Sequence, residues 1–289
     1  MRLFDRAAIV TGASRGLGRA IAERFVAEGA SVLLVARETG PLDEARAALA
    51  ARTTREGQVV EALAADVSHP ASADAIARRA ERALPDLAVV VNNAGIYGPF
   101  GRLDEVDWEE WERAVRVDLF GPALVCRAVI PLLRRRGFGK IVNVSGGGAT
   151  AALPRMSAYA SAKAALVRLT ETVAVELAPD RIDVNAMAPG PLATRMLDEV
   201  LAAGPERVGA EFHARAVRQR DEGGASLAGA AELAVFLASA DSDGITGRLL
   251  SAVWDDWTAL PARRAELAGS DDYTLRRVTP PPAPSKAGP

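Results

Sequence analysis

The chain has 289 residues, of which 49% are hydrophobic, 25% charged and 5% aromatic. This balance is typical of a folded globular protein and excludes a disordered or fibrous chain. The formal net charge of −2, from 35 basic and 37 acidic residues, argues against nucleic acid or an anionic membrane as partners, because both need a basic surface.

Cysteine, histidine and apolar runs exclude further classes. A single cysteine, Cys126, excludes an internal disulfide, and two histidines, His69 and His213, give no cluster for a metal site. The longest apolar run, residues 119–133, is interrupted by Arg127, so we expect no membrane span. The N-terminus lacks the long apolar region of a secretory signal. A cytoplasmic location fits these features.

Short aliphatic runs alternate along the chain with stretches of helical periodicity. Strands are predicted near Ala7–Thr11, Ser31–Ala36, Val59–Ala65, Leu87–Asn92, Lys140–Ser145, Ile182–Ala188 and Leu249–Val253. Helices are predicted near Gly16–Glu28, Pro41–Ala51, Ala71–Leu84, Trp108–Arg136, Ser157–Leu177 and Ala230–Ser239. The strand runs are apolar on both sides, as in parallel strands covered by helices. The sequence therefore predicts an α/β fold, a single-domain, Rossmann-type, doubly wound parallel sheet with helices on both faces.

No linker divides the chain, so we expect residues 1–260 to form one domain and residues 261–289 a C-terminal extension. The extension is rich in proline and is predicted to be disordered from about residue 280. Residues 202–224 are polar and weakly patterned. They fit either a mobile lid over a ligand crevice or an ordinary pair of surface helices.

A glycine-rich segment, residues 11–18, lies between the first predicted strand and the first predicted helix. Its glycines would let the backbone approach a pyrophosphate, and the helix that follows offers free N–H groups and the positive end of its dipole. The order of strand, loop and helix favours a phosphate site over a tight turn without a ligand.

The spacing G-x-x-x-G-x-G in this segment resembles the short-chain dehydrogenase/reductase family. Three more segments lie where that family has its motifs: Asn92–Gly95, Tyr159–Lys163 and Pro189–Thr194. The resemblance extends over about residues 6–253. It implies that the domain binds a dinucleotide and that hydride passes between a nicotinamide and a substrate carbon.

The resemblance also implies which residues hold the cofactor. Pro189, Gly190 and Thr194 would hold the nicotinamide carboxamide. Asp66 fits either the family's adenine contact or a helix N-cap. The expected cofactor-binding residues are Gly12, Ser14, Arg15, Gly16, Leu17, Gly18, Arg37, Asp66, Val67, Asn93, Ala94, Gly95, Tyr159, Lys163, Pro189, Gly190 and Thr194.

The end of the second predicted strand indicates which nicotinamide cofactor is used. Members that select NAD carry an acidic residue there, which accepts a hydrogen bond from the ribose 2′-OH. Ala36 occupies that position here, and Arg37 follows it. Arg15 can reach the same place, and two guanidinium groups suit a dianionic 2′-phosphate. We therefore expect NADP(H); the alternative is that both arginines are solvated surface residues.

Tyr159 and Lys163 are four residues apart in a predicted helix, so they share a face. The chain has only three tyrosines and three lysines, which makes a chance pairing at this spacing rare. An adjacent ammonium is expected to lower the pKa of the phenol toward the neutral range. By the resemblance, both are catalytic: Tyr159 is the general acid and base, and Lys163 also holds the nicotinamide ribose. The alternative is a buried tyrosine beside a surface lysine.

Two other catalytic positions of the family depart from its pattern. The family's Ser lies about thirteen residues before the Tyr, where this chain has Gly146, and Ser145 comes one residue earlier. We expect Ser145 to polarise the substrate carbonyl after a small loop adjustment; the alternative is a strand-end cap, with backbone N–H groups polarising the carbonyl. The family's helical Asn is replaced by Asp118, for which we expect a catalytic role with altered pH response, or simple pairing with an arginine.

After the last predicted strand, the family's usual Val-Asp-Gly-Gly is replaced by residues 254–257, Trp-Asp-Asp-Trp. This cluster fits binding of a polyhydroxylated ligand or, preferably, contact between subunits. With the Ser-Gly-Gly-Gly-Ala run it points to sugars or other polyhydroxylated metabolites. Tyr97 and Met196 fit either pocket walls or core packing.

These features together predict an NADP(H)-dependent oxidoreductase that interconverts a carbonyl and an alcohol of a small-molecule substrate. We expect a homodimer or homotetramer, with Val115–Val129 and Leu166–Val173 supplying the contacts. Two other classes stay open: a non-catalytic NADP(H)-binding sensor or scaffold, and an epimerase or dehydratase that recycles its cofactor.

Overall fold

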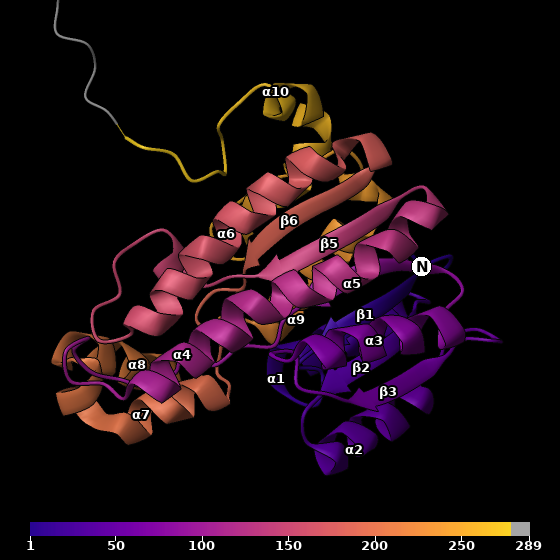
Figure 1. Cartoon of the computed structure of the whole chain (residues 1–289). Helices are drawn as coiled ribbons and strands as arrows, with labels where there is room; N and C mark the ends of the chain where they lie inside the picture. The colour runs from indigo at the N-terminus through magenta and orange to yellow at the C-terminus, as the bar shows by residue number, and fades with distance from the viewer. Residues whose placement is uncertain (279–289) are drawn as a thin grey trace, which may run out of the picture.

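The computed structural model describes residues 1–278, which are built around a seven-stranded parallel sheet (Figure 1). The strand order is β3-β2-β1-β4-β5-β6-β7, and each neighbouring pair is parallel. The strands are β1 Ala7–Thr11, β2 Ser31–Ala36, β3 Val60–Ala64, β4 Leu87–Asn92, β5 Gly139–Val144, β6 Ile182–Ala188 and β7 Leu249–Ser251. The predicted α/β doubly wound fold is confirmed.

Helices cover both faces of the sheet (Figure 1). They are α1 Gly16–Ala27, α2 Thr39–Ala50, α3 Pro70–Ala83, α4 Trp108–Val115, α5 Gly121–Arg136, α6 Ser157–Leu177, α7 Arg195–Val208, α8 Ala210–Glu222, α9 Leu227–Ala238 and α10 Arg264–Ala268. Alternate residues of β1 face opposite sides. Ala8 and Val10 join a hydrophobic cluster with α1, α2 and α9, whereas Ala7 and Ile9 join a second cluster with α3, α5 and α6.

The strand order places a crevice at the carboxyl edge of the sheet. Because β1 lies between β2 and β4, the chain winds in opposite directions on the two sides of β1. Loops that leave the sheet on either side of such a switch point separate, and ligands bind between them. The glycine-rich segment follows β1 directly, so it lies at this crevice.

The predicted continuous helix over residues 108–136 is interrupted by a π-helical turn, Arg116–Phe120. The backbone N–H of Gly121 bonds the carbonyl of the first residue of that turn, five residues back. Pro122, the next residue, has no N–H with which to continue the α-helical pattern. Asp118, in the middle of the turn, is fully buried.

The weakly patterned residues 202–224 lie in α7 and α8, which meet at Gly209. Gly204 has a φ of +75° and interrupts α7 just before Pro205. The segment is therefore helical, and residues of both helices line the cavity described below. Its role as a mobile lid stays a prediction.

After β7 the chain forms a 3-10 segment, Trp257–Arg263, and then α10. Residues 270–276 return to the edge of β7. The tail predicted to be disordered from about residue 280 lies outside the described residues. None of the helices within residues 1–278 is long and apolar enough to cross a membrane.

Candidate functional site

A cavity of about 1470 Å³ lies at the carboxyl edge of the sheet. Its walls come from the loops that follow β1 to β6 and from α7 and α8. All the predicted cofactor-binding residues line it, from Gly12 to Thr194. Tyr159, Lys163 and Ser145 also line it, whereas Asp118 is fully buried beneath its wall. The structure thus brings the four separated motifs to one place.

The glycine-rich segment forms a cradle that side chains would fill. Gly12 has a φ of +66°, and a Cβ on it would lie 2.8 Å from Nδ2 of Asn93. A Cβ on Gly18 would lie 2.3 Å from the carbonyl oxygen of Gly12. Helix α1 begins at Gly16, with no acidic residue in its first turn. These residues fit a dinucleotide pyrophosphate, whose negative charge is favoured at a helix N-terminus.

Thr11 and Asn93 tie the loop after β1 to the loop after β4. The Thr11 hydroxyl oxygen accepts hydrogen bonds from the backbone N–H groups of Asn93, at 3.0 Å, and Ala94, at 3.1 Å. The Asn93 side chain donates to the Thr11 carbonyl at 2.9 Å. Asn93 therefore positions the two loops as well as lining the cavity. Sequence reasoning missed Thr11 as a site residue, although a hydroxyl directly before a glycine loop was the available signal.

Arg15 and Arg37 line the cavity and are exposed. Arg15 is paired with Glu38, with Nη2 2.6 Å from Oε1, and this contact lowers the pKa of the Glu38 carboxyl. Glu38 also lines the cavity, and sequence reasoning overlooked it although it follows Arg37 directly. Position 36 is an alanine and carries no carboxylate. Two residues later, however, the carboxylate of Glu38 pairs with Arg15 and would compete with a 2′-phosphate for it.

Asp66 and Val67 line the cavity after β3. The Asp66 carboxylate accepts hydrogen bonds from the backbone N–H of Ser68, at 2.9 Å, and from its hydroxyl, at 2.7 Å. Helix α3 begins later, at Pro70, with His69 as its N-cap. The N-cap alternative for Asp66 is therefore wrong, and the adenine contact stays a prediction.

Tyr159 lies in the first turn of α6 and is held tightly at the cavity. A Cβ on Gly146 would lie 2.1 Å from the Tyr159 hydroxyl oxygen, so this position of the hydroxyl requires a residue without a side chain. The ring of Tyr97 meets the Tyr159 ring edge-on, with centroids 4.9 Å apart. Gly146, thirteen residues before Tyr159, therefore has a structural reason to be glycine where the family usually has serine.

Burial raises the pKa of Tyr159 well above its ordinary value, and Tyr97 and Asp118 add to the rise. The expected lowering of this pKa is therefore wrong. The Lys163 ammonium lies 5.7 Å from the ring centroid, and the nearby Asp118 carboxyl opposes its charge. Loss of water around the phenol is the largest cause of the raised pKa. Tyr159 consequently remains a neutral proton donor around pH 7.

Ser145 follows β5 and is buried at the cavity wall. Its backbone N–H donates to the carbonyl of Met187 at 2.8 Å. Its hydroxyl oxygen, in contrast, is buried without a hydrogen-bond partner among the described residues. A buried hydroxyl without a partner is unfavourable, so it favours binding of a polar ligand atom there. The side chain is not used as a strand-end cap.

Lys163, which lines the cavity, forms a buried pair with Asp118 beneath the cavity wall. The Lys163 ammonium donates to the carbonyl of Val144 at 3.0 Å and lies 4.0 Å from Oδ2 of Asp118. Oδ1 of Asp118 accepts from the backbone N–H of Ile96 at 2.9 Å, and Oδ2 has no hydrogen-bond partner among the described residues. Burial raises the pKa of Asp118 to about 6, against the opposing effect of Lys163. The charged neighbour of Asp118 is thus a lysine and not an arginine.

A family model described as short chain dehydrogenase matches residues 6–204. This chain belongs to the short-chain dehydrogenase/reductase family. The match covers the glycine cradle, the Tyr159–Lys163 pair and the segment after β6. The protein is therefore an oxidoreductase of alcohol or carbonyl groups that depends on NAD(P).

Relatives and solved structures of the family cover most of the chain. A galactitol 2-dehydrogenase from Agrobacterium fabrum is 32% identical over 263 residues, which is 89% of this chain and 99% of that protein. The crystal structure of a levodione reductase has a TM-score of 0.77 at 29% identity and covers 90% of this chain and 99% of that one. An NADPH-dependent reductase of bacilysin biosynthesis has a TM-score of 0.76 at 25% identity, with 86% and 96% covered.

The segment that replaces the family's Val-Asp-Gly-Gly does not act as one cluster. Trp257 packs on Phe236, with ring centroids 5.3 Å apart, and joins the hydrophobic core. The carboxylate of Asp255 accepts from the backbone N–H of Ser251 at 2.6 Å. Trp254 is 80% exposed at the rim of the cavity. Intramolecular packing therefore accounts for Trp257, and a backbone contact holds Asp255 at the cavity, whereas Trp254 and Asp256 are exposed.

The part of the cavity around Tyr159 is apolar. Tyr97 and Met196, predicted as pocket walls or core, line the cavity and also pack in a hydrophobic cluster. Other members that line the cavity are Leu153, Leu197, Val200, Phe212 and Ala216. Most of these come from α7 and α8, whose apolar side chains form a wall around Tyr159. The same two helices also bring polar and charged residues to the cavity: Arg195, Asp198, Glu199, Arg215, Gln219 and Arg220.

Proposed function

We infer that this protein is an NADP(H)-dependent reductase of an apolar ketone or aldehyde. One observation supports this most: the buried phenol of Tyr159 and the unpartnered hydroxyl of Ser145 line the same cavity as a glycine cradle suited to a pyrophosphate. Two hydroxyl groups at one end and an anion site at the other suit a carbonyl held beside a bound dinucleotide.

In the proposed reaction the bound cofactor supplies hydride from its nicotinamide ring. The Ser145 hydroxyl donates a hydrogen bond to the substrate carbonyl oxygen and stabilises the charge that develops there. Tyr159 donates its proton to the same oxygen. Because burial raises the pKa of Tyr159, the donor is protonated before the reaction, which favours reduction. Lys163 places a positive charge beneath the phenol and stabilises it after the proton leaves.

The cofactor preference is proposed from Arg15 and Arg37. Arg37→Ala should weaken NADPH binding by about ten- to a hundredfold, because it removes a charge-assisted bond to the 2′-phosphate, and should leave NADH binding nearly unchanged. Glu38→Gln should act in the opposite direction, strengthening NADPH binding by up to about fivefold, because Arg15 is freed from an exposed ion pair. Fluorescence titration of each variant with both cofactors measures these dissociation constants. Equal NADPH affinity of wild type and Arg37→Ala would overturn the preference.

The substrate class is proposed from the apolar wall around Tyr159. Desolvating a polyol against Leu153, Met196 and Phe212 would leave hydroxyl groups without partners, whereas a ring or alkyl chain gains from burial there. The sugar or polyol indication drawn from the sequence stays a prediction, which the substrate panel below compares with this one. The levodione reductase has the same fold, whereas the galactitol 2-dehydrogenase acts on a polyol, so the relatives alone leave both classes open.

A substrate panel tests the proposed function. Cyclic and aryl ketones, aldehydes, sugars and polyols of matched carbon number are supplied with NADPH or NADP⁺, and absorbance at the nicotinamide band is followed. We expect the cyclic and aryl ketones to show the highest kcat/KM. Binding of NADPH without oxidation by any carbonyl would favour a sensor. Substrate conversion without net NADPH consumption would favour an epimerase or dehydratase.

Asp118→Asn should change how stability depends on pH. Asp118 has a raised pKa, about 6, whereas an unfolded Asp titrates near 4. The carboxyl therefore stabilises the fold below about pH 4, and this contribution is lost as pH rises through about 6. Relative to Asp118→Asn, the wild type should lose roughly 2 kcal/mol of unfolding free energy between pH 4 and pH 7. Urea unfolding of both proteins across this range measures the difference.

The exposed Asp43 on α2 offers a matched control, Asp43→Asn, which removes a carboxylate far from Lys163. Its difference from wild type should stay nearly flat over the same pH range. A flat difference for Asp118→Asn as well would show that the buried carboxyl does not titrate there.

A further inference from the structure

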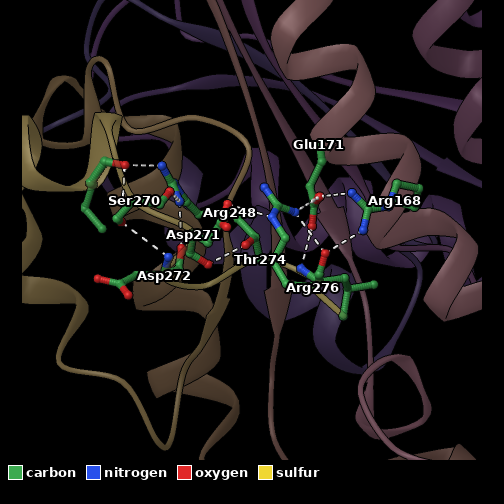
Figure 2. Close-up of polar contacts among 10 residues, drawn as sticks. Arg168, Glu171, Arg248, Ser270, Asp271, Asp272, Thr274 and Arg276 are labelled. Carbon is green, nitrogen blue, oxygen red and sulfur yellow. Dashed lines mark hydrogen bonds and ion pairs between the residues drawn. The ribbon is translucent and has the colours of Figure 1, made fainter. Parts of the chain in front are cut away.

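Residues 270–276, which we call the C-terminal segment, leave α10 and lie beside both β7 and α6. The backbone N–H of Leu249, on the edge strand β7, donates to the carbonyl of Tyr273 at 2.8 Å. Tyr273 and Thr274 line the same cavity as Tyr159 and Ser145. Figure 2 shows two groups of polar contacts that hold this segment, one around Arg248 and one around Glu171.

The first anchor is Arg248, which directly precedes β7 and is buried. Its guanidinium donates to the backbone carbonyls of Ser270, at 2.9 Å, and Asp272, at 2.7 Å, and also to that of Leu267 (Figure 2). A buried cation without acceptors is costly. Because the segment supplies two of these acceptors, its displacement would leave Arg248 with the Leu267 carbonyl in α10 alone.

The second anchor is Glu171 on α6, the helix that carries Tyr159. One carboxylate oxygen accepts from the backbone N–H of Leu275 at 2.7 Å, and the other accepts from Arg276 at 2.9 Å and from Arg168 (Figure 2). Arg168 also donates to the carbonyl of Leu275 at 2.5 Å. The segment is therefore bound to α6, the helix that carries Tyr159, because Glu171 and Arg168 hold the backbone of Leu275 and Glu171 also pairs with Arg276.

At the second anchor, the Leu275 side chain packs against a small hydrophobic cluster of Ala149, Val167 and Ala186. Ala149 ends the short 3-10 turn that follows Ser145 and Gly146. A Cβ on the residue before Ala149 would lie 2.8 Å from the Cα of Ala160 in α6, so this turn already presses against the helix of Tyr159. Leu275 thus packs on the cluster to which this loop contributes Ala149, three residues after the Gly146 that meets the Tyr159 hydroxyl.

The backbone of the segment is held in a conformation that it would not choose alone. Tyr273 has a φ of +59°, in the left-handed region that is disfavoured for large side chains. Such strain persists only where the surroundings impose it, and it is concentrated at functional sites. The two anchors on either side of Tyr273 provide that constraint.

We propose that the C-terminal segment is a positioning element of the active site, in which Leu275 holds the loop with Ser145 and Gly146 against Tyr159. Removal of the Leu275 side chain leaves a gap behind Ala149, so the loop gains freedom. The two hydroxyl groups then meet the substrate carbonyl less often in the reactive geometry. The glycine cradle lies on other loops and is unaffected. This inference rests on the proposed function, because the reaction is what requires that geometry.

The test uses four full-length variants. Leu275→Ala removes the contact, Leu275→Met restores the volume, and Glu171→Gln weakens the charged anchor without changing the packing. Leu132→Ala, at a half-buried leucine on α5 away from the cavity, is the matched control. Hydrogen exchange of the peptide that spans residues 146–149 reports on the loop without requiring turnover. Steady-state kinetics with a ketone that the protein reduces give kcat and KM. Titration with NADPH gives the affinity for the cofactor.

For Leu275→Ala we expect faster exchange in residues 146–149 and a kcat about ten- to a hundredfold lower, with KM and NADPH affinity within about twofold of wild type. Glu171→Gln should show the same pattern more weakly, and Leu275→Met should restore both readouts. Leu132→Ala should lower the melting temperature without either effect. Unchanged exchange in residues 146–149, or a loss of kcat equal to that of Leu132→Ala, would overturn the proposal. If the wild type reduces no carbonyl, the proposed function fails, while the exchange readout still decides whether Leu275 holds the loop.

Discussion

Tyr159→Phe is expected to lower kcat for carbonyl reduction by about 10²- to 10⁴-fold, the usual size of a general acid's contribution. NADPH affinity should stay within about twofold of wild type, because the glycine cradle and Arg37 are untouched. The substitution removes one oxygen and keeps the ring that packs edge-on against Tyr97. Stopped-flow measurement of NADPH oxidation with a saturating ketone, beside fluorescence titration of NADPH, separates the two effects.

Tyr97→Phe is the matched control, since it makes the same change in a neighbouring buried ring. Burial raises the pKa of Tyr97 to about 12, as it also raises that of Tyr159, but only Tyr159 has the Lys163 ammonium, 5.7 Å from its ring centroid, to stabilise it after the proton leaves. We expect its kcat within about fivefold of wild type, because only a pocket wall is altered. Equal activity of Tyr159→Phe and wild type would mean that another group donates the proton.

Gly146→Ser is expected to abolish most activity, although it restores serine at the position thirteen residues before Tyr159, where the family usually has it. A Cβ on Gly146 would lie 2.1 Å from the Tyr159 hydroxyl oxygen, so the phenol must move away from its present place. Displacement of a catalytic group by about 1 Å lowers kcat by about 100-fold. Kinetics of Gly146→Ser and Gly146→Ala with the same ketone measure the loss, and NADPH titration shows whether the cofactor site is intact.

The neighbouring glycine provides the control for this substitution. A Cβ on Gly147 would have no atom within 4 Å, so Gly147→Ala should keep kcat within about twofold of wild type. Gly146 itself has an extended backbone, with φ −172°, which any residue adopts, so the contact with Tyr159 is the reason for its sensitivity. Full activity of Gly146→Ser would show that the Tyr159 hydroxyl tolerates a side chain at position 146, contrary to this account.

The fold was predictable because its signal is local. Segments such as Ser31–Ala36 are apolar on both sides, and helical periodicity follows each of them, which is enough to predict a parallel sheet covered on both faces. The break at Pro122 was visible in the sequence, but proline in the first turn of a helix is common. Whether the chain forms a π-helical turn there depends on how Asp118 packs, which periodicity does not report.

The residues that line the site were also predictable, because a motif that ends a parallel strand must lie at the carboxyl edge of the sheet. The direction of the pKa shift of Tyr159, in contrast, was not predictable from the sequence. Spacing brings Lys163 near Tyr159, but the direction of the phenol's pKa depends on burial and on Asp118, which arrives from another helix. The C-terminal segment has no periodicity, so the packing of Leu275 on the cluster that contains Ala149 could not be inferred from the sequence.

The most direct test of the central claim is transfer of isotope from cofactor to product. NADPH carrying deuterium at either face of nicotinamide C4 is incubated with the wild-type protein and the best ketone of the panel, and the alcohol is analysed by mass spectrometry. One deuterium per alcohol, from one face only, is the expected result, with the rate falling in parallel for Tyr159→Phe. Alcohol formed without deuterium from either labelled form would contradict hydride transfer in this cavity.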